Sequence, residues 1–225
     1  MEGSHPLLRD HFPYLAGRKV MLAPGHVGYK GIGAKSIENV PYYSNDGSRD
    51  VTLDSAGYNE EQLNSYIVAD TLAVLEHTFV TPRICVGPFY HKAAQAYAWQ
   101  PDAFAEVHCN AAEDRDAHGF EIWTDNDPAS VALAKAIGKR FLSYTPLKFR
   151  GLKNMESADN AGTWKDKHDA LFEHMPLSER AFPLVLIECG FLSNPTDAAW
   201  LIDLSHHEKI AAAIVHGLND FFRGE

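Results

Sequence analysis

Cysteine is scarce in this chain, and its distribution argues against two kinds of scaffold. The three cysteines, Cys85, Cys109 and Cys189, are widely spaced and form no CxxC pair. An odd number at such spacing argues against a disulfide framework and against a cysteine-rich zinc site. We expect Cys109 and Cys189 to be small core residues, because each follows a polar residue on a predicted strand and so faces the opposite side of the sheet. A bridge between them is the less favoured alternative.

Positive charge and long apolar runs are also lacking. The 225 residues carry 20 Lys and Arg against 30 Asp and Glu, which gives a net charge of −10. This balance argues against a nucleic-acid binder and against electrostatic attachment to an anionic membrane. No run approaches the roughly 20 apolar residues of a membrane span, and the N-terminus lacks the apolar core of a signal peptide. We therefore expect no nucleic-acid partner and no membrane anchor, and the oligomeric state stays unknown.

The sequence does contain an alternation of strand and helix patterns. Short apolar runs predict strands over residues 18–26, 79–86, 104–109, 119–124 and 184–187. Amphipathic or proline-led patterns predict helices over residues 59–77, 126–142, 192–203 and 206–222. The alternation predicts an α/β fold, with a twisted, mostly parallel (mixed) sheet and helices on both faces. We expect one layered catalytic domain over residues 1–225, with its core at about 18–222.

A carboxylate stands where a buried strand ends. In "FPLVLIECGFLSNP", the apolar run from Leu184 to Ile187 is followed directly by Glu188. A charge in such a place is unfavourable unless something pairs with it. An ion pair with a nearby lysine or arginine would satisfy Glu188, and so would a catalytic site.

Three further polar side chains stand where strands end or helices begin. They are His26, Glu60 and His108. In an open α/β sheet, sites form at the carboxyl ends of the strands. Two imidazoles and one carboxylate match the His₂Glu set of a catalytic zinc, with Glu188 as the base. The scattered spacing does not decide this, because a lone histidine is more often a surface or core residue, and Glu60 could simply be a charge at a helix N-terminus.

A series of motifs resolves the ambiguity. The stretches "VMLAPGHVG", "NEEQLN", "AEVHCNA", "HGFEIW", "FRGLK" and "LVLIECGFLSNP" occur in this order. The order and content resemble the zinc-dependent N-acetylmuramoyl-L-alanine amidases, a family of cell-wall hydrolases. The resemblance runs from about residue 18 to residue 222, and "ECGFLSNP" is its most specific part.

The resemblance assigns a role to each candidate residue. It implies that His26, in the first-strand motif, and His108, in the H-x-N-A motif, bind one zinc per chain. Glu60 opens the E-x-x-x-N helix start, since Asn64 stands four residues further on, and is the implied third ligand. Glu188, directly before "CGFLSN", is the implied catalytic carboxylate. The implied reaction is zinc-assisted hydrolysis of the amide bond between N-acetylmuramic acid and L-alanine in peptidoglycan.

This chain departs from the family pattern beside the first histidine. The family usually has Asp before Pro-Gly-His, and this chain has Ala23; Val27-Gly28 replaces the usual Gly-Gly. The loss of a carboxylate near a zinc-binding imidazole bears on how that ring is oriented.

Two long polar segments, residues 28–58 and 152–180, are too long to be simple connections, and such loops are usually either functional or disordered. The second leads into the strand before Glu188, and a short helix is expected near its end. It is interpreted as plain surface, as a lid with Trp164 stacking on the substrate, or as a plug. Arg150, in the "FRGLK" motif, is a candidate substrate-binding residue, or belongs to a structural turn.

Two other functions stay open on the sequence. One is a zinc peptidase of related fold that acts on free peptides, and the other is a wall-binding module without turnover. We expect action on the cell wall, in the periplasm or on the extracellular face. With no signal peptide in this chain, a phage endolysin and an exported enzyme whose leader was trimmed both fit.

Overall fold

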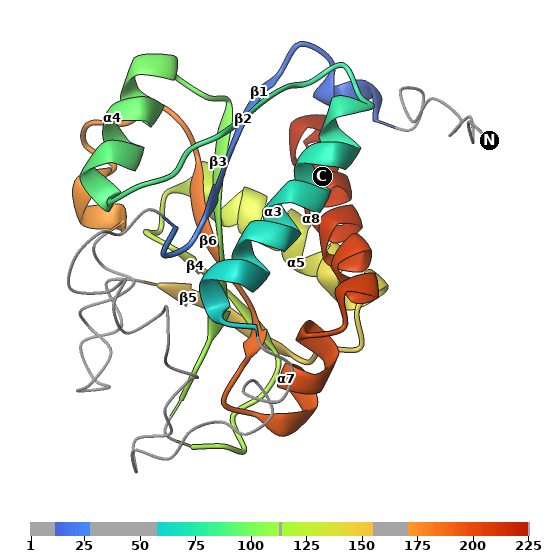
Figure 1. Cartoon of the computed structure of the whole chain (residues 1–225). Coiled ribbons are helices and arrows are strands. Elements are labelled where there is room, and N and C mark those ends of the chain that lie inside the picture. The colour runs from blue at the N-terminus through green and yellow to red at the C-terminus, as the bar shows by residue number, and fades with distance from the viewer. Residues whose placement is uncertain (1–11, 28–57, 113, 155–170, 225) are drawn as a thin grey trace.

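The computed structural model describes residues 12–27, 58–112, 114–154 and 171–224 (Figure 1). Its centre is a six-stranded sheet with the order β2-β1-β3-β6-β4-β5. The strands are β1 (Lys19–Pro24), β2 (Thr81–Ile84), β3 (Ala103–Asn110), β4 (Phe120–Thr124), β5 (Phe149–Asn154) and β6 (Leu184–Phe191). The first four strands in the sheet order run parallel, β4 runs antiparallel to β6, and β5 runs parallel to β4. This mixed, mostly parallel sheet confirms the predicted fold class.

Helices cover both faces of the sheet. They are α3 (Glu60–Glu76), α4 (Phe89–Trp99), α5 (Pro128–Tyr144), α7 (Pro195–Leu201) and α8 (His207–Arg223), with short 3₁₀ turns at η2 (Pro13–Leu15) and η4 (Leu204–His206). In Figure 1, α3, α5 and α8 lie on one side of the sheet and α4 lies on the other. No helix among the described residues is long and apolar enough to cross a membrane.

Local sequence chemistry fixes where two of the long helices begin. Asn59 caps α3 through a capping box: its side chain accepts from the backbone N–H of Gln62, and the Gln62 side chain accepts from the backbone N–H of Asn59. Asp127 caps α5 by accepting from the N–H of Ser130, and Pro128 takes the first helical position. The cap at Asn59 matters for function, because it makes the next residue, Glu60, the first of the helix.

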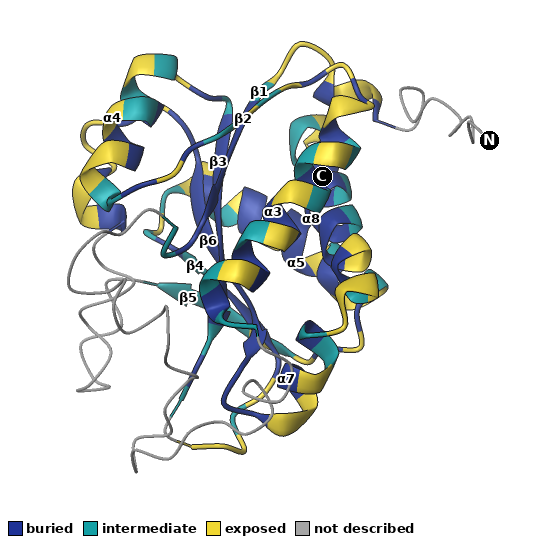
Figure 2. Cartoon of the chain, viewed as in Figure 1, coloured by how far each residue is buried: buried dark blue, intermediate teal, exposed yellow. Residues whose placement is uncertain are grey.

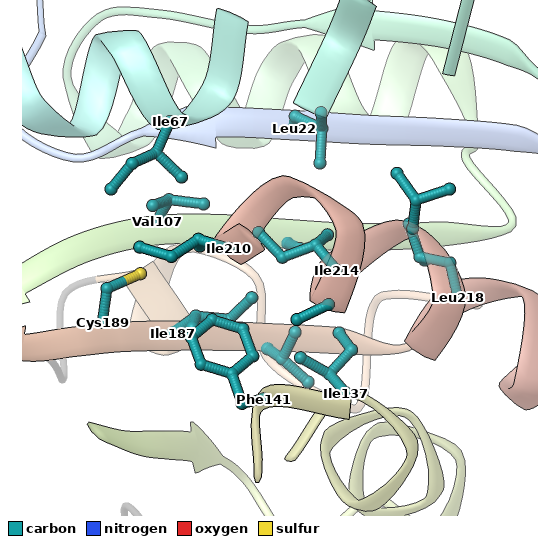
Figure 3. Packing of buried hydrophobic residues seen from close by; sticks show 14 of the residues in the cluster. Leu22, Ile67, Val107, Ile137, Phe141, Ile187, Cys189, Ile210, Ile214 and Leu218 are labelled. Atoms are coloured by element: carbon teal, nitrogen blue, oxygen red, sulfur yellow. The ribbon is translucent and has the colours of Figure 1, made fainter. Parts of the chain in front are cut away.

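The larger core fills the space between the sheet and the helices α3, α5 and α8. Figure 3 shows strand residues such as Val107 and Ile187 meeting Ile67 of α3, Phe141 of α5 and Ile214 of α8. All five side chains are fully buried. Each strand sends alternate side chains into this core, so the residues between them point to the opposite face. Figure 2 shows the result, with buried strands enclosed by helices whose outer sides are exposed.

The opposite face of the sheet carries a smaller core. Phe104, Leu184 and Leu186 pack there against α4 and against Leu171 and Met175. Residues 171–174 are helical, in agreement with the expected short helix. The three cysteines are free and buried, as expected for core residues.

Two elements of the fold were not predicted from the sequence. α4 lacks a clear apolar stripe, because one of its few fully buried residues is the charged Lys92. β5 is an edge strand of mostly intermediate burial, so its sequence has no continuous apolar run. Arg150 therefore lies in a strand and not in a connecting turn. Of the two long segments, residues 28–57 and 155–170 lie outside the described residues.

Candidate metal centre

Neighbouring strands bring two of the predicted ligands to one edge of the sheet. β1 and β3 are adjacent and parallel, with Pro24 opposite Val107. Because both strands end at the same edge, His26 follows the end of β1 close to where His108 stands near the end of β3. The two rings meet edge to face, with their centroids 4.9 Å apart.

The backbone around His26 is shaped for this approach. His26 has φ 65°, in the left-handed region that residues other than glycine rarely adopt, and such strain is typical of functional sites. Gly25 leaves room for the second ring, because a Cβ added there would lie 2.3 Å from Cε1 of His108. The tight turn and the absent side chain together allow the imidazoles to converge.

The carboxylate between the rings comes from the first residue of α3. Glu60 Oε2 lies 3.1 Å from Nε2 of His26, and Glu60 Oε1 lies 3.2 Å from Nδ1 of His108. The Oε1 atom also accepts from the backbone N–H of Cys109 at 3.3 Å. Asn64, the second residue of the E-x-x-x-N pattern, lies 3.5 Å from the same oxygen through its Nδ2 atom. Glu61, the residue after Glu60, is more exposed.

These three side chains form a set of donors that fits a zinc ion. One ligand atom from each of His26, Glu60 and His108 lies within 4.8 Å of the other two. A tetrahedral zinc with ligand bonds of about 2.0–2.2 Å holds neighbouring ligand atoms roughly 3.3 Å apart. His26 Nε2 and His108 Nδ1 lie at comparable distances, 3.1 and 3.2 Å, from the two different oxygens of Glu60. Two imidazoles and one carboxylate leave a fourth position open.

The electrostatics of the centre favour a charged carboxylate between two imidazoles. Burial by itself raises the pKa of Glu60, but the two imidazoles outweigh it and hold that pKa well below the usual range. Burial likewise lowers the pKa of His108, but hydrogen bonds to Glu106 and Glu60 raise it to about 10. A cation is thus favoured here, either as a proton on His108 or as a metal ion.

The fourth predicted residue lies on the strand beside β3. Glu188 of β6 stands directly opposite His108 in the parallel register, so both side chains project from the same face of the sheet. Glu188 is buried, and burial together with the carboxylates of Glu60, Glu121 and Glu106 raises its pKa well above the usual range, although His108 opposes this.

A comparison with known proteins gives this arrangement a family. The model of a family described as N-acetylmuramoyl-L-alanine amidase matches residues 20–220. The chain belongs to the N-acetylmuramoyl-L-alanine amidase family. The match confirms the resemblance carried by the sequence motifs, and it covers the ends of β1, β3 and β6 and the start of α3.

Individual relatives of this amidase-family chain agree. It is 26% identical over 208 residues to the probable cell wall amidase LytH of Staphylococcus aureus, covering 92% of this chain and 60% of LytH. The chain thus spans 60% of the length of this curated relative. The amidase of Clostridium difficile 630 has the same fold, with a TM-score of 0.67 and 22% identity over 94% of this chain and 99% of that one. AmiC2 of Nostoc punctiforme also has this fold, with a TM-score of 0.68 and 18% sequence identity. The match covers 92% of this chain and 99% of AmiC2.

Beside Glu188, this amidase-family chain has a charged cluster centred on Glu121. Glu121 of β4 stands opposite Glu188 in the antiparallel register and accepts a hydrogen bond from Asn110 at 2.8 Å. Arg150 donates to Glu121 at 3.1 Å, and the Nζ of Lys153 lies 3.5 Å away. Both cations come from β5 and are about one-third exposed. The structure therefore brings Arg150 to the edge of the site, whereas Trp164 lies outside the described residues.

Sequence reasoning missed several residues around the site. Glu121 belongs to the motif "HGFEIW", which indicates the family but does not by itself indicate a chemical role for this glutamate. Glu106 shows the same signal that drew attention to Glu188, a carboxylate within an apolar strand. The sequence gives no sign that Lys92 is buried, because its partner, Glu106, lies on a strand that follows α4 in the chain.

Proposed function

We propose that this chain hydrolyses the amide bond between N-acetylmuramic acid and L-alanine in peptidoglycan, with zinc held by His26, Glu60 and His108. The observation that carries the proposal is the convergence of this His₂Glu donor set with Glu188, in a chain of the N-acetylmuramoyl-L-alanine amidase family. Zinc, when bound, polarises the scissile carbonyl and lowers the pKa of a water molecule toward about 7.

Glu188 takes the proton of the attacking water and returns it to the leaving amine. This role is supported by the sheet register, since Glu188 stands opposite His108 and projects from the same face. The raised pKa of its carboxyl group makes Glu188 a stronger proton acceptor than an ordinary glutamate. Burial is the largest cause of this shift, and the neighbouring carboxylates add to it because they disfavour a further negative charge.

Arg150 and Lys153 on β5 lie beside Glu121. In this proposal, Arg150 orients the substrate. Arg150 lies over the ring of Phe191, with its Cζ 4.7 Å from the ring centroid, and donates to Glu121. A guanidinium held in this way is suited to bind a carboxylate of the stem peptide. Trp164, by the same proposal, stacks on glycan or stem peptide from the segment that precedes β6.

This function places the action of the chain on the cell wall, because peptidoglycan is the material of that wall. A zinc peptidase acting on free peptides is the competing function. Product analysis separates the two, since the amidase frees the amino group of L-alanine and creates no new reducing sugar ends.

The decisive experiment is digestion of purified peptidoglycan by the full chain, with and without a chelator, followed by mass analysis of the products. We expect stem peptides with free L-alanine amino groups, loss of activity on chelation and recovery with zinc. His108→Ala should bind much less than one zinc per chain and should be inactive. Full zinc occupancy and normal turnover in this variant would remove His108 from the site, and cleavage within the stem peptide would refute the amidase assignment.

A further inference from the structure

A buried ion pair reaches the metal centre from the side opposite Glu60. Glu106 lies on β3 two residues before His108, so both side chains project from the same face of the sheet. Glu106 Oε1 lies 2.7 Å from Nζ of Lys92, on α4, and 3.0 Å from Nε2 of His108. The side chains of Lys92 and Glu106 are both fully buried. Lys92 also donates to the carbonyl of Pro24 at 3.1 Å, close to the strand end that leads to His26.

The two nitrogens of the His108 ring therefore face different carboxylates. Nδ1 faces Glu60 and the metal position, and Nε2 faces Glu106. A neutral imidazole carries its proton on one nitrogen and has a lone pair on the other. If Nε2 donates to Glu106, the lone pair on Nδ1 points to the side where Glu60 and His26 lie.

Stability alone explains this pair poorly. A buried ion pair is often no better than an apolar pair of similar size, because both charges lose their hydration. Glu106 is not even fully satisfied, since its Oε2 is buried with no hydrogen-bond partner among the residues that the structure describes. A pair of this kind is better explained by what it does for His108.

The sheet register links Glu106 to the departure from the family pattern. Glu106 stands directly opposite Ala23 on β1, the position where the family usually has Asp. Side chains at opposed positions of neighbouring strands project from the same face. The carboxylate that the family usually has on β1 is therefore absent at Ala23, and this chain has one at the opposed position on β3, at Glu106.

We propose that Glu106 is a positioning residue of the zinc centre: it accepts the Nε2 proton of His108, which keeps the Nδ1 lone pair for the metal, and Lys92 holds Glu106 in place. This inference rests on the zinc centre proposed above. Carboxylates that orient a metal-binding histidine in this way typically account for 10–100-fold in metal affinity.

The test uses a double variant that removes both charges at once. Lys92→Met/Glu106→Leu replaces the pair by apolar side chains of similar size and leaves no buried charge unpaired. Zinc affinity is measured on the apo protein by competition with a chromophoric chelator, and the Co²⁺ absorption spectrum reports the ligand geometry. We expect zinc affinity to fall 10–100-fold and the Co²⁺ spectrum to change, while the apo protein melts as cooperatively as the wild type.

Two further variants complete the design. Arg140→Met/Asp220→Asn removes an ion pair from the packing of α5 against α8, away from the site, and should leave zinc affinity unchanged. Adding Ala23→Asp to the first double variant returns a carboxylate to the opposite strand and should restore most of the affinity. No restoration would contradict the idea that His108 needs a carboxylate at this level of the sheet.

Unchanged zinc affinity with an unchanged Co²⁺ spectrum in Lys92→Met/Glu106→Leu would overturn the inference. If that variant does not fold, Glu106→Asp keeps the charges and shortens the reach to His108 by one methylene. A zinc affinity about tenfold weaker in it would support the proposal, and wild-type affinity would refute it. A wild-type chain that takes up no zinc would instead overturn the proposed centre itself.

Discussion

Gly25→Ala tests the centre by adding a single methyl group. The new Cβ would lie 2.3 Å from Cε1 of His108 and 2.4 Å from both ring nitrogens. Carbon atoms in contact are normally about 3.5–4.0 Å apart, so the ring has to move by about 1 Å. It cannot do so freely, because Glu60 holds Nδ1 and Glu106 holds Nε2.

The consequence for zinc follows from the narrow tolerance of metal bonds. Ligand distances in a working site stay within about 0.2 Å of their normal values, so a shift of about 1 Å breaks the bond to His108 or displaces Glu60. We expect zinc affinity to fall by at least about 10²-fold, comparable to the effect of misplacing a catalytic group by this distance. Peptidoglycan hydrolysis should fall at least as much.

The assay compares zinc affinity, peptidoglycan hydrolysis and melting of the apo protein. Gly138→Ala on α5 is the matched control, since its Cβ would lie 3.3 Å from the Phe149 ring and alanine favours the helix by about 0.5–1 kcal/mol. The control should keep both zinc and activity. Wild-type zinc affinity in Gly25→Ala would refute the packing argument, and loss of zinc with loss of folding would show that Gly25 serves the fold as a whole.

Three other substitutions test separate parts of the structure. Glu188→Gln should keep zinc and lower turnover by roughly 10²–10⁴-fold, because glutamine cannot take a proton; loss of zinc would instead make Glu188 a ligand. Trp164→Ala should raise KM for peptidoglycan at unchanged zinc content, and unchanged kinetics would reduce the residue to plain surface. Asp220→Asn should lower the free energy of unfolding by about 2 kcal/mol at pH 7, since it weakens a charged pair with Arg140. Burial raises the pKa of Asp220, but Arg140 outweighs it and holds that pKa below the usual value. In urea titrations, the stability difference between wild type and Asp220→Asn should therefore persist above about pH 4 and shrink as pH falls through the folded pKa. A stability difference independent of pH would contradict this.

The sequence determined the local structure where a short stretch carries its own signal. The pattern over residues 59–77 predicted α3, whose start is set locally because the Asn59 cap bonds to backbone only a few residues away. Glu188 stood out because a charge at the end of an apolar strand is anomalous on its own. The ligand set came mainly from motif order, since the spacing of His26, Glu60 and His108 is not distinctive.

The tertiary structure alone decided which distant residues meet. That Glu188 lies opposite His108 and Glu106 opposite Ala23 depends on the order and register of the strands, which no local pattern encodes. No local pattern marks Lys92 as a buried residue, and only the packing of α4 on the sheet makes it the partner of Glu106. Periodicity and capping are interactions between near neighbours in the chain, whereas the metal centre and its supporting charges join side chains from five separate elements or strand ends.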